Sequence, residues 1–326
     1  MSATSPLGSV LEAGGLELAR GLEQTERRLV EIVGDQGADL APHASSTLAA
    51  GGKRLRPMLV FLCGRDSGAG LVAAAAAVEL LHMATLVHDD VLDGASLRRG
   101  KPTVFATGGR AAATATGDLL FSRAFAELAS TGSERAVASL SAASSELARG
   151  ELMQRDDAFA PDVTKARYLD RCALKTASLF AAACRIGAAL GMPDRRSEQT
   201  LGSFGRETGL AFQILDDILD ISGSSSRTGK QRGADLLDGT VTLPLIIARR
   251  RDRHLERLDL RTLEGDAATA EAVCNRIAAT GALHDARAEA LRFVRKAKAA
   301  VATLDLPPSR LKALDLVADG VVERYS

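Results

Sequence analysis

Apolar and polar positions along the chain follow a helical pattern almost throughout. Runs of roughly 15 to 30 residues are built mainly from Ala, Leu, Glu and Arg, the strong helix formers, and short breakers rich in Gly, Pro, Asp and Ser separate them. The strict alternation with β-branched residues that is typical of strands is absent. Long helices with short loops become antiparallel neighbours. The pattern therefore predicts an all-α fold, one large antiparallel helix bundle, with residues 1–326 forming a single domain.

Two of the most apolar helical runs end in the same acidic pattern, DDxxD. Its members are Asp89, Asp90 and Asp93 in the first run, and Asp216, Asp217 and Asp220 in the second. The first and third aspartates are four residues apart and share one helix face. Carboxylates near a helix C-terminus oppose the helix dipole, so their repetition suggests cations between two facing helices. Carboxylate oxygens together with substrate phosphates suit Mg²⁺. The alternative is two solvated helix ends, because exposed like charges cost only about 0.2–0.5 kcal/mol.

Basic residues near the first motif indicate an anion site. Lys53 and Arg56 follow a glycine pair, and Arg98 and Arg99 follow the first acidic motif. His82 lies two helical turns before that motif, on the same face. A histidine on an apolar helix is ordinarily a satisfied core residue, but these basic neighbours favour anion binding. A metal-free diphosphate pocket beside a metal-bound one implies two substrates.

Composition narrows the functional class. The chain has 41 basic and 41 acidic residues, no Trp and two Tyr, which argues against a nucleic-acid-binding surface or a base-stacking platform. Its four cysteines are scattered, which suggests neither a zinc site nor a disulfide framework and fits the cytoplasm. The N-terminus does not resemble a signal peptide. The most apolar stretch contains Glu79 and His82, so we expect a buried helix and no transmembrane segment.

The Gly/Ser-rich segment 222–233 follows the second acidic motif directly. It is either a flexible connector or, because it carries Lys230 and Arg232, a flap that covers phosphates. The charged helical tail from Glu264 onward is interpreted as a solvated face.

Five segments in order resemble the trans-isoprenyl diphosphate synthases of the polyprenyl synthetase family. These are GGKRLRP, ELLHMATLVHDDVLDGASLRRGKPTV, ALKTASLF, GLAFQILDDILD and GKQRGADLLDGTVTLPLI, which run from residue 51 to about 247. The resemblance implies a helix bundle around a central cavity and a cytoplasmic enzyme, commonly a homodimer. It also implies the activity: isopentenyl diphosphate is condensed head to tail with an allylic diphosphate.

The resemblance also implies residue roles by position. A Mg²⁺ cluster, usually of three ions in the family, would be held by Asp89, Asp93, Asp216 and Asp220, with Asp217 and Asp90 in supporting positions. The allylic diphosphate would be contacted by Arg98, Lys175 and Lys230, and isopentenyl diphosphate by Lys53, Arg56, His82 and Arg99. Thr176 and Gln213 lie where the family places groups near the developing allylic cation. The departing diphosphate would accept the proton that is lost.

Two details concern rate and product length. The family often has a second lysine where this chain has Thr240, which removes one expected cationic contact. Short-chain members tend to carry bulky aromatic residues just before the first motif, where this chain has Ala84 and Thr85. These small residues suggest an open tunnel and a product of C30 or longer.

Three alternatives stay open. One is a short-chain geranylgeranyl or farnesyl diphosphate synthase, in which a facing helix closes the tunnel. A class I terpene cyclase would have an aromatic-lined cavity, whereas aromatic residues make up only 3% of this chain. A non-catalytic subunit of a heteromeric synthase would be expected to lose acidic ligands, but both motifs are intact.

Overall fold

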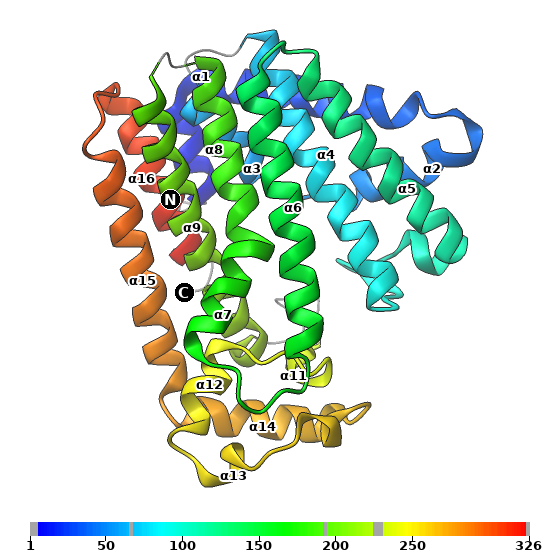
Figure 1. The fold of residues 1–326 in the computed structure, drawn as a ribbon, viewed down its shortest axis with the longest axis vertical. Coiled ribbons are helices and arrows are strands. Elements are labelled where there is room, and N and C mark those ends of the chain that lie inside the picture. The colour runs from blue at the N-terminus through cyan, green and yellow to red at the C-terminus, as the bar shows by residue number, and fades with distance from the viewer. Residues whose placement is uncertain (1–5, 65–67, 192–193, 224–230, 324–326) are drawn as a thin grey trace, which may run out of the picture. The chain divides into compact units, whose positions relative to one another are not determined.

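The structure is a computed structural model that describes residues 6–64, 68–191, 194–223 and 231–323 (Figure 1). Its first half contains α1 (Pro6–Gly34), α2 (Gly37–Ala49), α3 (Leu55–Cys63), α4 (Ala69–Leu92), β1 (Leu97–Arg98), β2 (Lys101–Pro102), α5 (Val104–Ala129), α6 (Glu134–Asp157) and α7 (Lys165–Cys172). The remainder contains the π-helix η1 (Ala173–Ala177), α8 (Ser178–Gly191), α9 (Arg195–Ser222), α11 (Ala234–Leu237), α12 (Leu243–Arg249), α13 (Arg253–Glu256), the 3₁₀-helix η2 (Leu260–Leu263), α14 (Ala267–Ala279), α15 (Ala282–Val301) and α16 (Pro308–Glu323).

The all-α prediction is confirmed, with one small addition. Strands β1 and β2 form a two-residue antiparallel hairpin in which Arg98 pairs with Lys101. Both residues of its turn, Arg99 and Gly100, have positive φ values (53° and 74°), as the commonest two-residue hairpin turn requires. The hairpin is too short to produce an alternating sequence pattern, which explains why no strand was predicted.

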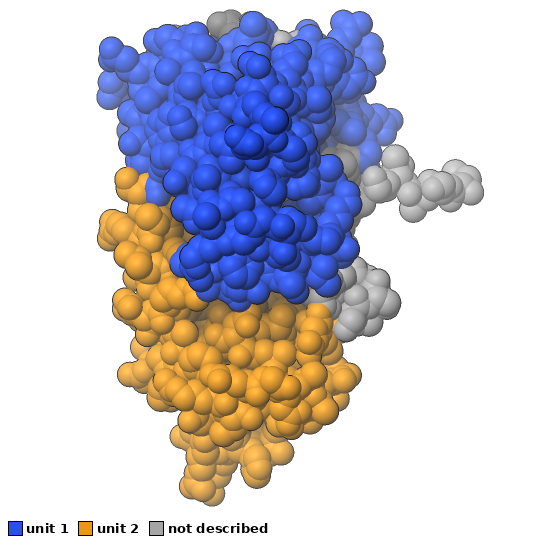
Figure 2. Space-filling view, turned by 90° about the vertical axis from the view of Figure 1, so that its right-hand side faces the viewer, with its two compact units in different colours: residues 1–144, 179–202, 304–314 blue, residues 145–178, 203–303, 315–326 orange. Residues whose placement is uncertain are grey.

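The chain divides into two compact units, which Figure 2 shows in different colours. Unit 1 comprises residues 1–144, 179–202 and 304–314, and unit 2 comprises residues 145–178, 203–303 and 315–326. Each unit is described by itself below. The single domain over residues 1–326 stays a prediction.

Helix α4 is the centre of unit 1, where it packs against α1, α3 and α5. Residues 74–81 are all buried, as expected for a helix that is apolar on every side. Alanine occupies residues 73–77 of this helix, and such small side chains let neighbouring backbones approach closely. This core fixes the residues at the C-terminal end of α4, where the first acidic motif lies.

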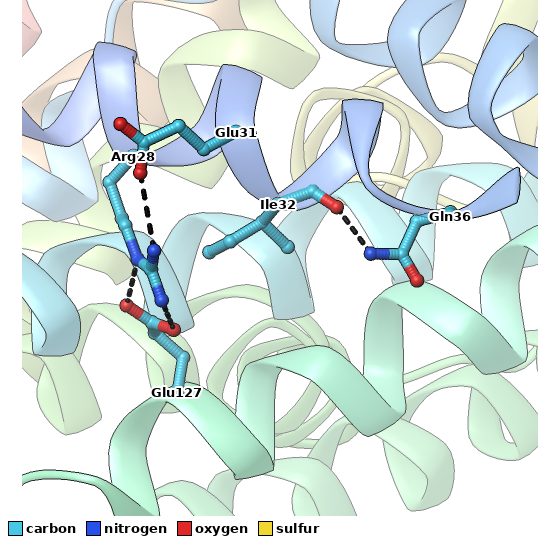
Figure 3. Close-up of polar contacts among 5 residues, drawn as sticks. All are labelled: Arg28, Glu31, Ile32, Gln36 and Glu127. Carbon is cyan, nitrogen blue, oxygen red and sulfur yellow. Dashed lines mark hydrogen bonds and ion pairs between the residues drawn. The ribbon is translucent and has the colours of Figure 1, made fainter.

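An ion pair joins two of these elements at their polar edge. Arg28 of α1 donates from Nε and Nη2 to the two carboxylate oxygens of Glu127 in α5, at 2.7 and 2.9 Å (Figure 3). Glu31, one turn further along α1, accepts from the same guanidinium at 3.2 Å. The paired carboxylates raise the pKa of Arg28 above its usual value. Such a bidentate arrangement fixes helix register better than a single contact does.

In unit 2, helix α12 packs against α7, α14 and α15. A buried ion pair ties α7 to α6, because Arg171 Nη1 donates to Asp157 Oδ2 at 3.1 Å. Arg171 also donates to the backbone oxygen of Val241 at 2.6 Å, just before α12 begins. Removing either partner of a buried pair leaves an uncompensated charge, so these contacts hold the three segments together.

In the described part of the chain, two helical stretches are long and apolar enough to cross a membrane, Ala69–Leu92 and Lys165–Gly191. In both, 72% of the most apolar window is buried inside the structure, as in the core helix of a folded domain. The absence of a transmembrane segment stays a prediction.

Candidate active site

The first acidic motif lies at the C-terminal end of α4, as predicted, and a Schellman motif ends the helix there. Gly94 has a φ of 62°, and the backbone N–H of Ala95 donates to the oxygen of Asp90 at 2.9 Å. The N–H of Asp93 donates to the oxygen of Asp89 at 2.8 Å, so these two aspartates are one helical turn apart. Asp89 is half-buried and Asp93 is exposed. The glycine in the sequence DVLDG is the local signal for this end.

The middle aspartate of the motif has a different environment. Asp90 is 5% exposed, and its Oδ1 accepts from Arg98 Nε at 2.8 Å and from Arg98 Nη2 at 2.7 Å. A buried carboxylate is stable as an ion only with such partners. Asp90 therefore anchors the β1–β2 hairpin to α4 and sets the position of Arg98.

Arginine charges lie near His82 in unit 1. Burial and the positive charges of Arg56, Arg99 and Arg98 lower the pKa of His82 well below its usual value. Burial also lowers the pKa of Arg56, to about 10, although Glu79 opposes the shift. The structure thus brings four of the five predicted anion-binding residues near one another, namely Arg56, His82, Arg98 and Arg99. The fifth, Lys53, is exposed and lies three residues before Arg56 in the sequence.

Arg56 carries the clearest mark of an unfilled polar site. Its guanidinium lies 4.7 Å from the ring centre of Phe180 in α8. Its Nε is buried and has no hydrogen-bond partner in the described part of the chain. A buried donor without a partner costs about 1–3 kcal/mol, so its retention suggests a ligand.

Neighbouring carboxylates balance part of this charge. Arg54 donates to Glu79 at 2.7 Å and also pairs with Glu26, so it serves the packing of α1 and α4. Arg54 and Arg99 both have left-handed backbone conformations, with φ values of 49° and 53°. Strained backbone of this kind at non-glycine residues is concentrated at functional sites.

The second acidic motif lies in the last two turns of α9, in unit 2. Its middle aspartate, Asp217, is again buried and accepts from Tyr168 Oη at 2.6 Å and from Gln213 Nε2 at 2.8 Å. Burial and the nearby charge of Asp235 raise the pKa of Asp217 to about 8. Asp216 and Asp220 are half-buried. The two motifs therefore share one division of roles: a bonded middle aspartate between outer ones that are more accessible.

The Asp217 contacts extend to the predicted cation-stabilising residues. The Gln213 side chain, held at its nitrogen by Asp217, accepts from Thr176 Oγ1 through its oxygen at 2.7 Å. Tyr168, Asp217, Gln213 and Thr176 thus form one chain of hydrogen bonds, which fixes the Gln213 amide orientation. The proton of the Thr176 hydroxyl is committed to Gln213, so the hydroxyl oxygen presents its lone pairs elsewhere.

Lys175 and Thr176 lie in the π-helix between α7 and α8. π-Turns are rare and frequently occur at functional sites, because the extra residue changes the direction of the side chains. Gly150 of α6 makes the turn possible, since a Cβ there would lie 2.5 Å from the backbone nitrogen of Lys175. Lys175 pairs with Glu151. Burial would raise the pKa of Glu151, but the charges and hydrogen bonds of Lys175 and Arg155 together lower it.

Residues after α9 are tied to the last aspartate of the motif. Asp220 accepts from the backbone N–H of Gly233 through its main-chain oxygen, and from the N–H of Asp235 through Oδ2. Arg232 donates to the oxygen of Ile221 at 2.6 Å and to Asn275 at 2.8 Å. Arg232 thus has structural partners, while Lys230 lies outside the described residues. Thr240 is half-buried, and its N–H donates to the oxygen of Asp235.

The outer carboxylates of each motif are oxygen ligands of the kind that Mg²⁺ takes. Within the described ranges, no three His, Cys, Asp or Glu side chains lie close enough to hold an ion by themselves. Such a partial set suits Mg²⁺, which is usually held by one or two carboxylates, with waters and substrate phosphates completing its shell. Asp90 is bonded to Arg98, and Asp217 to Tyr168 and Gln213, whereas the outer aspartates of each motif are more accessible.

Comparison with known proteins decides the family. A sequence model described as polyprenyl synthetase matches residues 39–280. The chain belongs to the polyprenyl synthetase family. It is 40% identical over 284 residues to heptaprenyl diphosphate synthase component 2 of Geobacillus stearothermophilus, covering 86% of this chain and 88% of that protein. It is 36% identical over 283 residues to octaprenyl diphosphate synthase of Escherichia coli (strain K12), covering 85% and 87%.

A solved structure agrees with this membership. The polyprenyl synthase from Caulobacter crescentus CB15, complexed with calcium and isoprenyl diphosphate, superposes with a TM-score of 0.91 at 34% identity and complete coverage of both chains. The resemblance to trans-isoprenyl diphosphate synthases is therefore confirmed, and this polyprenyl synthetase is a prenyltransferase.

Several residues of this polyprenyl synthetase were not predicted from the sequence. Tyr168 orients Asp217, Glu151 pairs with Lys175, and Gly150 accommodates the π-turn. Tyr168 is one of only two tyrosines and lies seven residues before Lys175, which is a weak signal at best. Glu151 and Gly150 carry no signal, because their partners are far away in the sequence.

The environment of His82 predicts a pH dependence of stability. The folded pKa of His82 lies well below its unfolded value of about 6.5, so only the unfolded chain takes up a proton at this residue as the pH falls through 6.5. Protonation then favours unfolding, by up to about 1.4 kcal/mol per pH unit. We expect His82→Gln to remove this contribution, so that its stability falls less than that of the wild type on acidification.

Urea unfolding above and below pH 6.5 measures the effect. The exposed His254, outside this cluster, provides the matched control variant His254→Gln. If the wild type and His82→Gln lost the same stability as the pH falls, the inference that His82 is neutral in the folded protein would be wrong.

Proposed function

We propose that this prenyltransferase condenses isopentenyl diphosphate with an allylic diphosphate in a Mg²⁺-dependent, head-to-tail reaction that gives a trans-polyprenyl diphosphate. One observation carries the proposal: the basic cluster around His82 retains a buried, unpartnered Arg56 Nε in the same unit as the DDxxD motif of α4, among the residues that the structure describes. The basic cluster can bind an anion without a metal, and the acidic motif can bind an anion together with a metal ion. Two diphosphate substrates match this pair.

Four residues would hold isopentenyl diphosphate. Arg56 offers its orphaned Nε, His82 stays neutral and so can donate a hydrogen bond without adding charge, and Lys53 and Arg99 complete the set. A dianionic phosphate would offset the mutual repulsion of the arginines. In the free protein Glu79 offsets part of the positive charge, because it accepts from Arg54 at 2.7 Å.

The allylic substrate would bind through Arg98, Lys175 and Lys230, and the metal ligands would be Asp89, Asp93, Asp216 and Asp220. When bound, Mg²⁺ neutralises charge on the diphosphate and makes it a better leaving group. Arg98 is set in place by Asp90 and has further N–H donors on the same guanidinium. Lys175 is set by Glu151. The lysine that Thr240 replaces would have been one more cation, so we expect slower ionisation with the reaction type unchanged.

The reaction would begin with heterolysis of the allylic C–O bond, with the electron pair leaving on diphosphate. The double bond of isopentenyl diphosphate then forms the new C–C bond to the allylic carbon. The departing diphosphate takes the proton that is lost. The lone pairs of Thr176 Oγ1 would face the developing cation, because its proton is held by Gln213. Groups oriented in advance stabilise charge without reorganising during the step.

Product length would be set by α4. Ala84 is fully buried, whereas Thr85 is half-buried and donates from Oγ1 to the oxygen of His82. No aromatic side chain occupies either position, which supports a chain of C30 or longer. The heptaprenyl and octaprenyl names of the two curated relatives support the same length class. A homodimer located in the cytoplasm completes the proposal.

A class I terpene cyclase and a non-catalytic subunit remain the alternatives from other classes. The purified chain alone, given Mg²⁺, farnesyl diphosphate and labelled isopentenyl diphosphate, separates them. We expect elongated prenyl diphosphates that disappear with EDTA. A cyclic hydrocarbon or no product would contradict the proposal.

The first acidic motif provides a sharper test. Asp89→Asn should lower the rate at least about 100-fold, because it removes a proposed metal ligand. Because Asn has nearly the same shape as Asp, Asp89→Asn should lower the unfolding free energy less than Asp90→Asn does. Asp90→Asn should lower the unfolding free energy by about 1–3 kcal/mol, because Arg98 loses the charge of its partner. Turnover and denaturant unfolding of both variants measure the contrast. If the two substitutions lowered turnover equally and lowered stability equally, the assignment of Asp89 to the metal and Asp90 to Arg98 would be wrong.

Thr85→Phe should shorten the product, because it places an aromatic ring one helical turn before the first motif, where the growing chain is proposed to pass. Thr85→Val, which has nearly the same shape, is the matched control and should give the wild-type length. Chromatography of the dephosphorylated prenyl alcohols measures the distribution. An unchanged distribution in Thr85→Phe would show that this residue does not line the path of the growing chain.

A further inference from the structure

Unit 2 contains a cavity of about 510 Å³ that none of the proposed substrate residues line. It lies against helices α12 and α15, which pack together, and the first residue of α7 also reaches it. We call it the α12–α15 cavity. Its size falls within the range of small-molecule pockets in proteins, roughly 300–1,000 Å³.

Cationic side chains dominate the lining of this cavity. They come from three segments: Lys165, Arg250, Arg251, Arg292 and Arg295. Only two carboxylates, Asp285 and Glu289, face them, which leaves a formal excess of three positive charges among the described lining residues. The whole chain has as many acidic as basic residues, so this excess is local.

The two carboxylates are already engaged. Asp285 pairs with Arg251, and Glu289 accepts from Lys165 at 3.1 Å and also from Arg292. The guanidiniums of Arg250 and Arg295 are exposed, and in the part of the chain that the structure describes neither has a hydrogen bond or ion pair with another residue. They belong to different elements, since Arg250 directly follows α12 and Arg295 lies in α15.

The remaining lining is apolar. Leu243 and Ile247 of α12 and Ala288 of α15 complete it, and Leu243 is fully buried. On α15 the small Ala288 lies between the two carboxylate positions, at residues 285 and 289. A surface that only solvates its charges needs neither a cavity nor an apolar wall. The combination suits a ligand with a multiply charged head and an apolar part.

We propose that the α12–α15 cavity binds the phosphate or diphosphate group of a small amphiphilic ligand, with Arg250 and Arg295 as its main contacts. Planar guanidiniums match phosphate oxygens in pairs, which favours phosphate over a single carboxylate. The head group can come from a soluble phosphate ester or from a phospholipid. This inference does not rest on the proposed reaction, because none of the proposed reaction residues lines the cavity.

A local probe separates this cavity from any other diphosphate site in the protein. All four native cysteines are buried, so Ala288→Cys can be labelled selectively with a fluorinated tag. We expect inorganic diphosphate to shift the ¹⁹F resonance saturably in the labelled full chain. Adding Arg250→Gln and Arg295→Gln should weaken this response at least about tenfold, because charge-assisted hydrogen bonds are lost.

Arg253→Gln with Arg257→Gln is the matched control. Both residues are exposed, lie in the same unit outside the cavity lining, and give the same change in net charge. The control should respond as the parent does. Equal weakening in the control would overturn the proposal, since it would show a long-range charge effect.

A second arm identifies the source of the head group. Sedimentation with phosphatidate vesicles in a phosphatidylcholine background, compared with pure phosphatidylcholine, should depend on Arg250 and Arg295 if the ligand is a lipid. A ¹⁹F response to inorganic diphosphate without vesicle binding assigns a soluble phosphate ester. No response to either probe would overturn the proposal. Circular dichroism of the unlabelled variants checks that each is folded. Calorimetry of the same proteins should show one diphosphate fewer bound in Arg250→Gln with Arg295→Gln than in the parent.

Discussion

The cost of keeping like charges together at low dielectric is the constraint on which both acidic motifs and the basic cluster depend. Each motif meets it at its buried middle aspartate, but in a different way. Asp90 pairs with the charge of Arg98, whereas burial raises the pKa of Asp217 to about 8, and its partners are the neutral Tyr168 and Gln213. A buried carboxylate without such partners would lose several kcal/mol of solvation. Two of these partners, Arg98 and Gln213, are themselves residues proposed to act on the substrate. Satisfying the middle aspartate therefore also positions the chemistry.

The basic cluster shows the same constraint with the opposite sign. Burial and the nearby arginines lower the pKa of His82, and Glu79 and Glu26 balance only part of the arginine charge. Positive charges that are incompletely balanced lower the stability of the free protein. A bound anion would offset this repulsion and stabilise the fold. This trade is typical of binding sites, where strain and charge are retained for function. The left-handed backbone at Arg54 and Arg99 adds to the cost.

Much of this organisation could be predicted from the sequence. Helix-forming composition and short breakers predicted the all-α fold, and two DDxxD patterns at the ends of apolar helices identified both acidic motifs. His82 was assigned to the basic cluster because local spacing fixes which residues share a helix face. The π-turn that carries Lys175 and Thr176 could not be predicted, because it depends on the distant Gly150. The Tyr168–Asp217 bond and the Glu151–Lys175 pair are likewise contacts that only the folded chain brings together.

We propose, as the central claim, that the outer aspartates of both motifs act on one allylic diphosphate. Calorimetry of Mg²⁺-dependent binding of a non-ionising farnesyl thiodiphosphate to the wild type, Asp89→Asn, Asp216→Asn and the double variant tests it most directly. If both aspartates serve one metal-bound ligand, the account predicts that either substitution removes most of the affinity and that the double variant loses little more. Independent losses that add in the double variant would contradict it.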